Sequence, residues 1–271
     1  MADHLAALVR ANAFDRYIAA LFAAPDKRDA LFALYAFDIE ISRICDLVHD
    51  SLPGEIRLQW WRDVVNGERD GEAAGHPVAS ALLKVIKDHD LPRSAFDAYC
   101  EARIFEFYAD VMPDQTALEA YLGATQSSMI QLSAMILDRD DAKLVSDAAG
   151  HAGVAVGIAQ ITARLAIITR RSQGFVPQDM LAALGTSSEA LFKGEATAQV
   201  PQALAALSRE HLAKFEVLRP AIPVSLKPAF LHIALVPRVL KSALKSPDIF
   251  SQPAKVSQLA RMFDILRAAM K

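Results

Sequence analysis

The chain has 271 residues, of which 53% are hydrophobic and 23% are charged. This composition supplies enough apolar surface for a packed core and therefore excludes an intrinsically disordered chain. The 29 basic and 32 acidic side chains give a net charge of −3, which excludes a strongly basic nucleic-acid-binding protein. We therefore expect a globular protein that has no nucleic-acid partner.

The two cysteines, Cys45 and Cys100, are far apart in the chain and form no CxxC pair. This pattern is typical of a reducing compartment, where buried thiols pack as small apolar groups. The first residues lack the basic and then apolar order of a secretory signal peptide. The longest apolar stretch, 152–159, is far shorter than the roughly 20 residues of a membrane-spanning helix. We expect a cytoplasmic protein, and peripheral contact with the inner membrane stays open.

Apolar side chains recur at helical spacing along the whole chain, and no segment shows the alternation of a strand. Because alanine and leucine also favour helices, we expect one all-α domain spanning 1–271. The expected helices cover residues 5–23, 27–50, 55–65, 78–89, 93–109, 116–137, 142–170, 178–184, 188–192, 201–218, 225–244 and 255–270. Residues 67–77 and 172–177 are expected loops. Prolines within 225–244 should divide that helix into shorter pieces.

The common motifs of metal and nucleotide sites are missing from the sequence. No histidines stand at metal-ligand spacing and there is no HExxH, so we expect no zinc site. The glycines near residue 150 do not form GxGxxG and follow no strand. Ala149, Gly153 and Gly157 instead form a stripe of small residues on one helix face, which predicts close packing of a neighbouring helix.

An aromatic and cationic patch lies within 57–63, where Arg57, Trp60, Trp61 and Arg62 occur together. One interpretation places one tryptophan in the core, its neighbour half-buried, and the arginines on the solvent side. The other makes the patch a contact surface for a partner, since tryptophan and arginine are enriched at interface anchors.

The segment 35–50 is the most chemically suggestive part of the chain. On one continuous helix, Ser42, Asp46 and Asp50 would share a face, and Glu40 would pair with Arg43. Carboxylates four residues apart hold a divalent cation when a second acidic helix faces them. A solvated helix face is the plainer interpretation.

At these residues the sequence resembles the squalene/phytoene synthase family, over about residues 14–250. It is more similar still to a divergent branch of that family. The members of this branch are phytoene-synthase-like assembly factors of respiratory complex I. The stretches that carry the resemblance are 31–40, 57–63, 125–128, 148–158, 175–177 and 248–250.

The resemblance implies an all-α isoprenoid-synthase-like helical bundle around a central cavity. In the related enzymes two Asp-rich motifs face each other across that cavity and hold Mg²⁺, which neutralises the diphosphate of a prenyl substrate. Tyr35 and Gln126 lie in matching stretches, and we include them among the candidate cavity or ligand-binding residues.

This chain departs from the acidic pattern of the family. The first motif falls on residues 42–46, which keep Asp46 but carry Ser42 and Arg43 at the other positions. The second motif falls on Arg164 and Ile168, and a preceding family asparagine falls on Gln160. No acidic residue occurs from 148 to 178. We expect Arg43 and Arg164 to face each other or Asp46 across the cavity.

Two functions follow from the resemblance. The first is a non-catalytic assembly factor, for which we expect no cofactor and no catalytic residues. Its partner would be a complex I subunit or an assembly intermediate. The alternative is a Mg²⁺-dependent prenyltransferase, or a metal-independent binder of an isoprenoid or lipidic phosphate through Arg43 and Arg164. A helical scaffold unrelated to either would require the matching stretches to be coincidental.

Overall fold

The computed structural model describes residues 2–48, 50–195 and 198–271. Within these ranges the regular structure is helical, and the sole β interaction is an isolated parallel bridge between Val111 and Gly174. The predicted all-α class is therefore confirmed.

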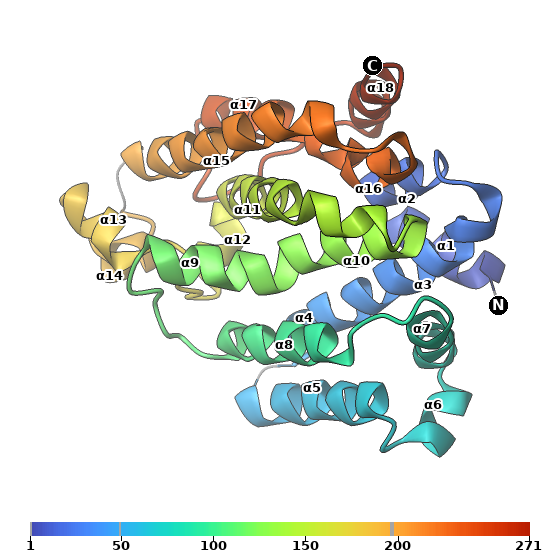
Figure 1. Cartoon of the computed structure of the whole chain (residues 1–271). Helices are drawn as coiled ribbons and strands as arrows, with labels where there is room; N and C mark the ends of the chain where they lie inside the picture. The colour runs from blue at the N-terminus through green and yellow to red at the C-terminus, as the bar shows by residue number, and fades with distance from the viewer. Residues whose placement is uncertain (1, 49, 196–197) are drawn as a thin grey trace.

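The first half of the chain surrounds α3, which runs through the body of the molecule with α5 to α8 on one side of it (Figure 1). The helices of this half are α1 (Ala2–Asn12), α2 (Phe14–Ala20), α3 (Pro25–Ser42), α4 (Ile44–Leu47), α5 (Ser51–Asn66), α6 (Asp70–Gly75), α7 (Pro77–Asp88) and α8 (Arg93–Arg103).

The second half builds the opposite side, where α11 lies between α10 and α15 (Figure 1). Its helices are α9 (Gln115–Leu122), α10 (Ser128–Leu137), α11 (Ser146–Ala163), α12 (Leu165–Arg170), α13 (Gln178–Ala183), α14 (Ser188–Phe192), α15 (Gln199–Leu218), α16 (Lys227–Phe230), α17 (Val236–Lys245) and α18 (Gln258–Ala269).

A π-helical turn, Gly123–Ser127, joins α9 to α10 without interrupting the rod. It packs against α11, where a Cβ atom on Gly153 would overlap the backbone of Ser127. A Cβ atom on Gly157 would overlap the side chain of Leu122. The close helix packing predicted from the stripe of small residues is therefore confirmed.

Several predicted helices are divided in the structure. The backbone leaves helical geometry at Ala13, between α1 and α2. Helix α3 ends at Ser42, and α4 is a single turn that ends before the extended backbone of Val48. The prediction of one helix over 27–50 was therefore wrong in its last part, and residue 49 lies outside the described residues.

Other boundaries follow from proline and from local capping. The predicted loop 67–77 contains α6, so that part of the prediction was wrong. Residues 225–244 are divided as expected, into 3₁₀ turns at Val224–Leu226 and Leu231–Leu235 and the helices α16 and α17. Pro228 and Pro237 each lie in the first turn of a helix, where a missing N–H costs nothing.

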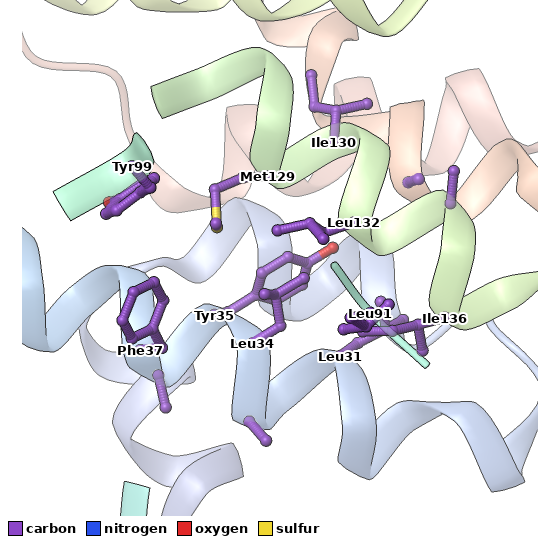
Figure 2. Close-up of a cluster of buried hydrophobic side chains, with 14 of the residues drawn as sticks. Leu31, Leu34, Tyr35, Phe37, Leu91, Tyr99, Met129, Ile130, Leu132 and Ile136 are labelled. Atoms are coloured by element: carbon purple, nitrogen blue, oxygen red, sulfur yellow. The ribbon is translucent and has the colours of Figure 1, made fainter. Parts of the chain in front are cut away.

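The core forms where α3 meets α10 and α8. Leu31, Leu34 and Tyr35 of α3 lie opposite Met129 and Leu132 of α10 (Figure 2). Nearby, the ring of Phe37 packs edge-on or tilted against the rings of Trp61, Phe96 and Tyr99. This packing fixes the orientation of α3 and of the polar side chain that follows Phe37.

One helical segment, Asp141–Ala163, is long and apolar enough to cross a membrane by length and composition. Two thirds of its apolar window, 67%, is buried inside the protein. Such burial is what the central helix of a packed core shows, and α11 occupies that place.

His232, in the 3₁₀ turn between α16 and α17, is buried and its ring nitrogens have no hydrogen-bond partner among the described residues. Burial, reinforced by the charge of Arg16, lowers the pKa of His232 to about 3. The folded protein therefore holds this ring neutral, whereas the unfolded chain protonates it below a pKa of about 6.5.

We expect this histidine to make the protein less stable as the pH falls below about 6.5, because only the unfolded state gains the proton. In His232→Leu that penalty is absent. The free energy of unfolding of the variant, measured relative to that of the wild type, should therefore rise by about 2 kcal/mol between pH 7 and pH 5. Urea unfolding of both proteins at both pH values measures this. An equal pH dependence in the two proteins would contradict it.

Candidate functional site

A buried carboxylate, Asp38, lies at the centre of the molecule. It extends from the inner face of α3 and meets side chains from α2 and α8. Nη1 of Arg16 donates to Oδ2 of Asp38 at 2.5 Å, and Nη2 of Arg103 lies 3.5 Å from Oδ1. The Tyr99 hydroxyl also donates to Oδ1. Two cations and one phenol therefore surround a single carboxylate.

The same set of contacts continues to a second acid. Nη1 of Arg103 donates to Oε1 of Glu106 at 2.7 Å, and the Tyr121 hydroxyl donates to the same oxygen at 2.5 Å. Nη2 of Arg103 donates to the Tyr99 hydroxyl at 2.7 Å. We call Arg16, Asp38, Tyr99, Arg103, Glu106 and Tyr121 the buried ion network. Its two arginines and two carboxylates balance in charge.

The electrostatics of the buried ion network keep Asp38, Tyr99 and Tyr121 each in one protonation state. Burial alone would raise the pKa of Asp38, but the charges of Arg16 and Arg103 outweigh it and hold that pKa below its usual value. Burial raises the pKa of Tyr99 and of Tyr121 well above the usual value for a phenol. At neutral pH the carboxylate stays charged and both phenols stay protonated, so these groups bind one another and have no proton to exchange.

Two candidate residues from the sequence belong to the surroundings of Arg16. Oε1 of Gln126, in the π-helical turn, accepts a hydrogen bond from Nη2 of Arg16 at 3.1 Å. The guanidinium of Arg16 lies 5.5 Å from the ring centroid of Tyr35, whose hydroxyl accepts from Ser133 at 3.2 Å. Tyr35 and Gln126 therefore both contact the guanidinium of Arg16 within the packed interior.

Of the remaining polar candidates, Asp46 lies beside a pocket of about 340 Å³ near the surface. Nη1 of Arg171 contacts Oδ1 of Asp46 at 2.6 Å, with 37% and 47% of the two side chains exposed. The pocket is lined by Cys45, Asp46, Val48, Asp50, Glu106, Phe107, Arg171 and Gln173.

The expected acidic face does not form. Ser42 is the last residue of α3, Asp46 lies on α4, and Asp50 immediately precedes α5. The break at Arg43 and the extended backbone after α4 therefore keep these three residues off a common helix face. Glu40 and Arg43 make no ion pair among the residues that the structure describes.

Arg43, Gln160 and Arg164 are exposed. Arg164 stands at the break between α11 and α12. The partner of Asp46 is Arg171, so the expectation that Arg43 or Arg164 would face Asp46 was wrong. None of Arg43, Gln160 and Arg164 lines the pocket.

The residues around the pocket are a poor fit to Mg²⁺. Asp46 is neutralised by Arg171, and Glu106 is bound by Arg103 and Tyr121. Across residues 2–48, 50–195 and 198–271, no group of three or more His, Cys, Asp or Glu side chains is arranged to hold a metal ion. A hard cation needs several free oxygen ligands, and two of the three carboxylates that line the pocket, those of Asp46 and Glu106, are already engaged.

The tryptophan pair has mainly a packing role in the structure. Trp61 is buried, and Trp60 is half-buried with its Nε1 donating to Glu72 at 2.8 Å. The two rings meet edge to face, with centroids 5.1 Å apart. Arg57 is exposed, and Arg62 pairs with acidic side chains of α8. The interpretation with one tryptophan in the core and its neighbour half-buried is confirmed.

Solved structures share this architecture. A dehydrosqualene synthase in complex with a ligand superimposes with a TM-score of 0.80 over 99% of this chain and 95% of its own, at 15% identity. Squalene synthase HpnC from Alicyclobacillus acidocaldarius gives a TM-score of 0.67 over 98% and 92%, at 16% identity. These likenesses confirm the predicted isoprenoid-synthase fold.

Curated relatives are similar over most of the chain. The Homo sapiens protein named NADH dehydrogenase (ubiquinone) complex I, assembly factor 6 is 27% identical over 247 residues, covering 90% of this chain and 74% of its own length. A homolog from Dictyostelium discoideum is 25% identical and covers 86% and 67%. The squalene/phytoene synthase family profile matches residues 9–260. This chain therefore belongs to the squalene/phytoene synthase family.

Proposed function

We propose that this protein is a squalene/phytoene synthase-like assembly factor for respiratory complex I and that it does not transfer prenyl groups. The names of the similar curated proteins support the assembly role. The observation that carries the non-catalytic part is the ion pair between Asp46 and Arg171. It uses the carboxylate that a metal-dependent relative would need, and residues 148–178, which include most of α11 and all of α12, contain no acidic residue that could serve as a second one.

The alternative, a binder of prenyl or other lipidic phosphates, has less support. Three carboxylates line the pocket, those of Asp46, Asp50 and Glu106, and only one arginine accompanies them. A diphosphate would be repelled by the acids and would compete with Asp46 for Arg171. Incubation with farnesyl or geranylgeranyl diphosphate and Mg²⁺ should yield no product, and turnover would contradict the non-catalytic proposal.

We place the contact with the complex on the outer face of α5. Leu52 and Ile56 are exposed there, one helical turn apart, and Arg57 is exposed beside them. Behind this face, Trp61 and Leu58 anchor α5 in the core. A rigid helix that presents apolar side chains beside an arginine has the composition of an interface anchor.

Deletion of the gene should lower the amount of assembled, membrane-bound complex I, and the wild-type gene should restore it. Ile56→Asp should restore it poorly, because a charge at the centre of an apolar contact should weaken binding by about tenfold or more. Leu144→Asp, at an exposed leucine on another element, is the matched control and should restore it fully. Native gels stained for NADH dehydrogenase activity measure the outcome.

The two parts of this proposal fail differently. Normal levels of mature complex I after deletion would contradict the assembly role itself. Full restoration by Ile56→Asp would contradict only the placement of the contact on α5.

A further inference from the structure

Helix α18 carries an exposed apolar stripe along its outer side. Leu259, Phe263, Leu266 and Met270 are 75%, 61%, 39% and 80% exposed. At 3.6 residues per turn these four positions fall within an arc of roughly 60°. A soluble surface usually scatters its exposed apolar residues singly, so a continuous stripe marks a contact face.

The opposite side of α18 is held firmly against the body of the protein. Ile265 is fully buried against Ala19 of α2 and against Leu231 and Leu235. Two ion pairs flank this contact and join α18 to α17 and to α2. They are Arg238 with Asp264 and Arg261 with Asp15. The stripe is therefore fixed outward, and α18 itself lies at the edge of the molecule (Figure 1).

The C-terminal segment that carries the stripe is rich in basic residues. Residues 236–271 contain seven lysines and arginines and only two acidic residues, although the whole chain has more acids than bases. One of the two acids, Asp264, is neutralised by its ion pair with Arg238. The exposed cations that remain close to α18 in sequence are Lys241, Lys245, Lys255, Arg267 and Lys271.

We propose that α18 is a membrane-docking surface that binds the interface of an anionic lipid bilayer. An apolar stripe with flanking lysines and arginines matches such an interface, because the apolar side chains enter the acyl boundary while the cations meet anionic headgroups. A second copy of this chain would place like charges opposite each other. Four side chains on one helix also offer far less than the roughly 800 Å² per partner of a stable dimer.

Binding to vesicles tests this surface with the full chain. The wild type should co-sediment with vesicles of phosphatidylcholine and phosphatidylglycerol, more weakly as salt rises, and bind poorly to phosphatidylcholine alone. Leu259→Asp should lower the affinity for the anionic vesicles about tenfold, because burial of one leucine is lost and a repelled charge is added. Leu144→Asp is the matched control, since Leu144 is 74% exposed and receives the same charge.

Three results would overturn the proposal. The first is no binding of the wild type to anionic vesicles, and the second is equal binding of Leu259→Asp and Leu144→Asp. The third is a dimer in sedimentation velocity that Leu259→Asp converts to a monomer, because the stripe would then be an interface between copies. Circular dichroism spectra that match the wild type exclude misfolding of either variant as the cause.

Discussion

Asp38→Ala is expected to lower the free energy of unfolding by about 3–5 kcal/mol. The substitution removes the carboxylate that Arg16, Arg103 and Tyr99 all contact in the interior. Arg103 keeps Glu106, but Arg16 keeps only the amide oxygen of Gln126 as a hydrogen-bond partner among the described residues. A buried cation without a counter-charge accounts for most of the expected cost.

Urea unfolding measures this loss, and two further variants test its cause. Asp46→Ala breaks the exposed pair with Arg171 and should cost less than about 1 kcal/mol. The double variant Arg16→Met with Asp38→Leu removes both charges and should recover part of the stability. Equal losses for Asp38→Ala and Asp46→Ala would contradict the central place of Asp38.

The same carboxylate should give the fold a distinct acid sensitivity. The pKa of Asp38 in the folded protein lies below its unfolded value, so its stabilisation is present above that unfolded value, near 3.8, and is lost as the pH falls further. Below pH 3.8 the free energy of unfolding should therefore fall less steeply with pH in the Arg16→Met, Asp38→Leu double variant than in the wild type.

Gly153→Ala is expected to destabilise the protein by about 3 kcal/mol, at the upper end of overpacking costs. The added Cβ atom would overlap backbone atoms of Ser127 in the π-helical turn, and backbone cannot move aside as a side-chain end does. To admit the methyl group, α11 would have to move away from the rod formed by α9 and α10.

Gly150→Ala is the matched control, on the same helix and one turn earlier. A Cβ atom at Gly150 meets nothing within 4 Å, so alanine there should stabilise α11 by about 0.5–1 kcal/mol. Thermal unfolding of the two variants should therefore move in opposite directions. A loss of stability in Gly150→Ala as large as in Gly153→Ala would contradict the assigned packing.

Much of the fold could be predicted from the sequence because helical periodicity and the stripe of small residues are local signals. Ala149, Gly153 and Gly157 predicted the close approach that the structure has. The breaks at Ala13 and at Arg43 could not be predicted, since neither carries a proline or a glycine. Tertiary packing decides there where one helix stops and the next begins.

The candidate site was predictable only in part. Asp38 shares its helical spacing with Leu31, Leu34 and Ile41, so a carboxylate on an apolar face already signalled a buried charge that needs a partner. The identity of the partners depends on how α2 and α8 pack against α3, which the sequence of α3 does not contain. Arg171 was missed for a related reason, because the break at Arg164 changes which arginine reaches Asp46.

The π-helical turn between α9 and α10 lets one continuous rod serve two separate cores. Leu118 and Leu122, before the turn, belong to one apolar cluster, whereas Met129 and Leu132, after it, belong to the other. One extra residue in a turn rotates every later side chain about the helix axis, so the inward face changes partners without a loop. The angular phase of α10 relative to α9, and the position of Gln126 within the turn and beside Arg16, therefore both depend on this turn.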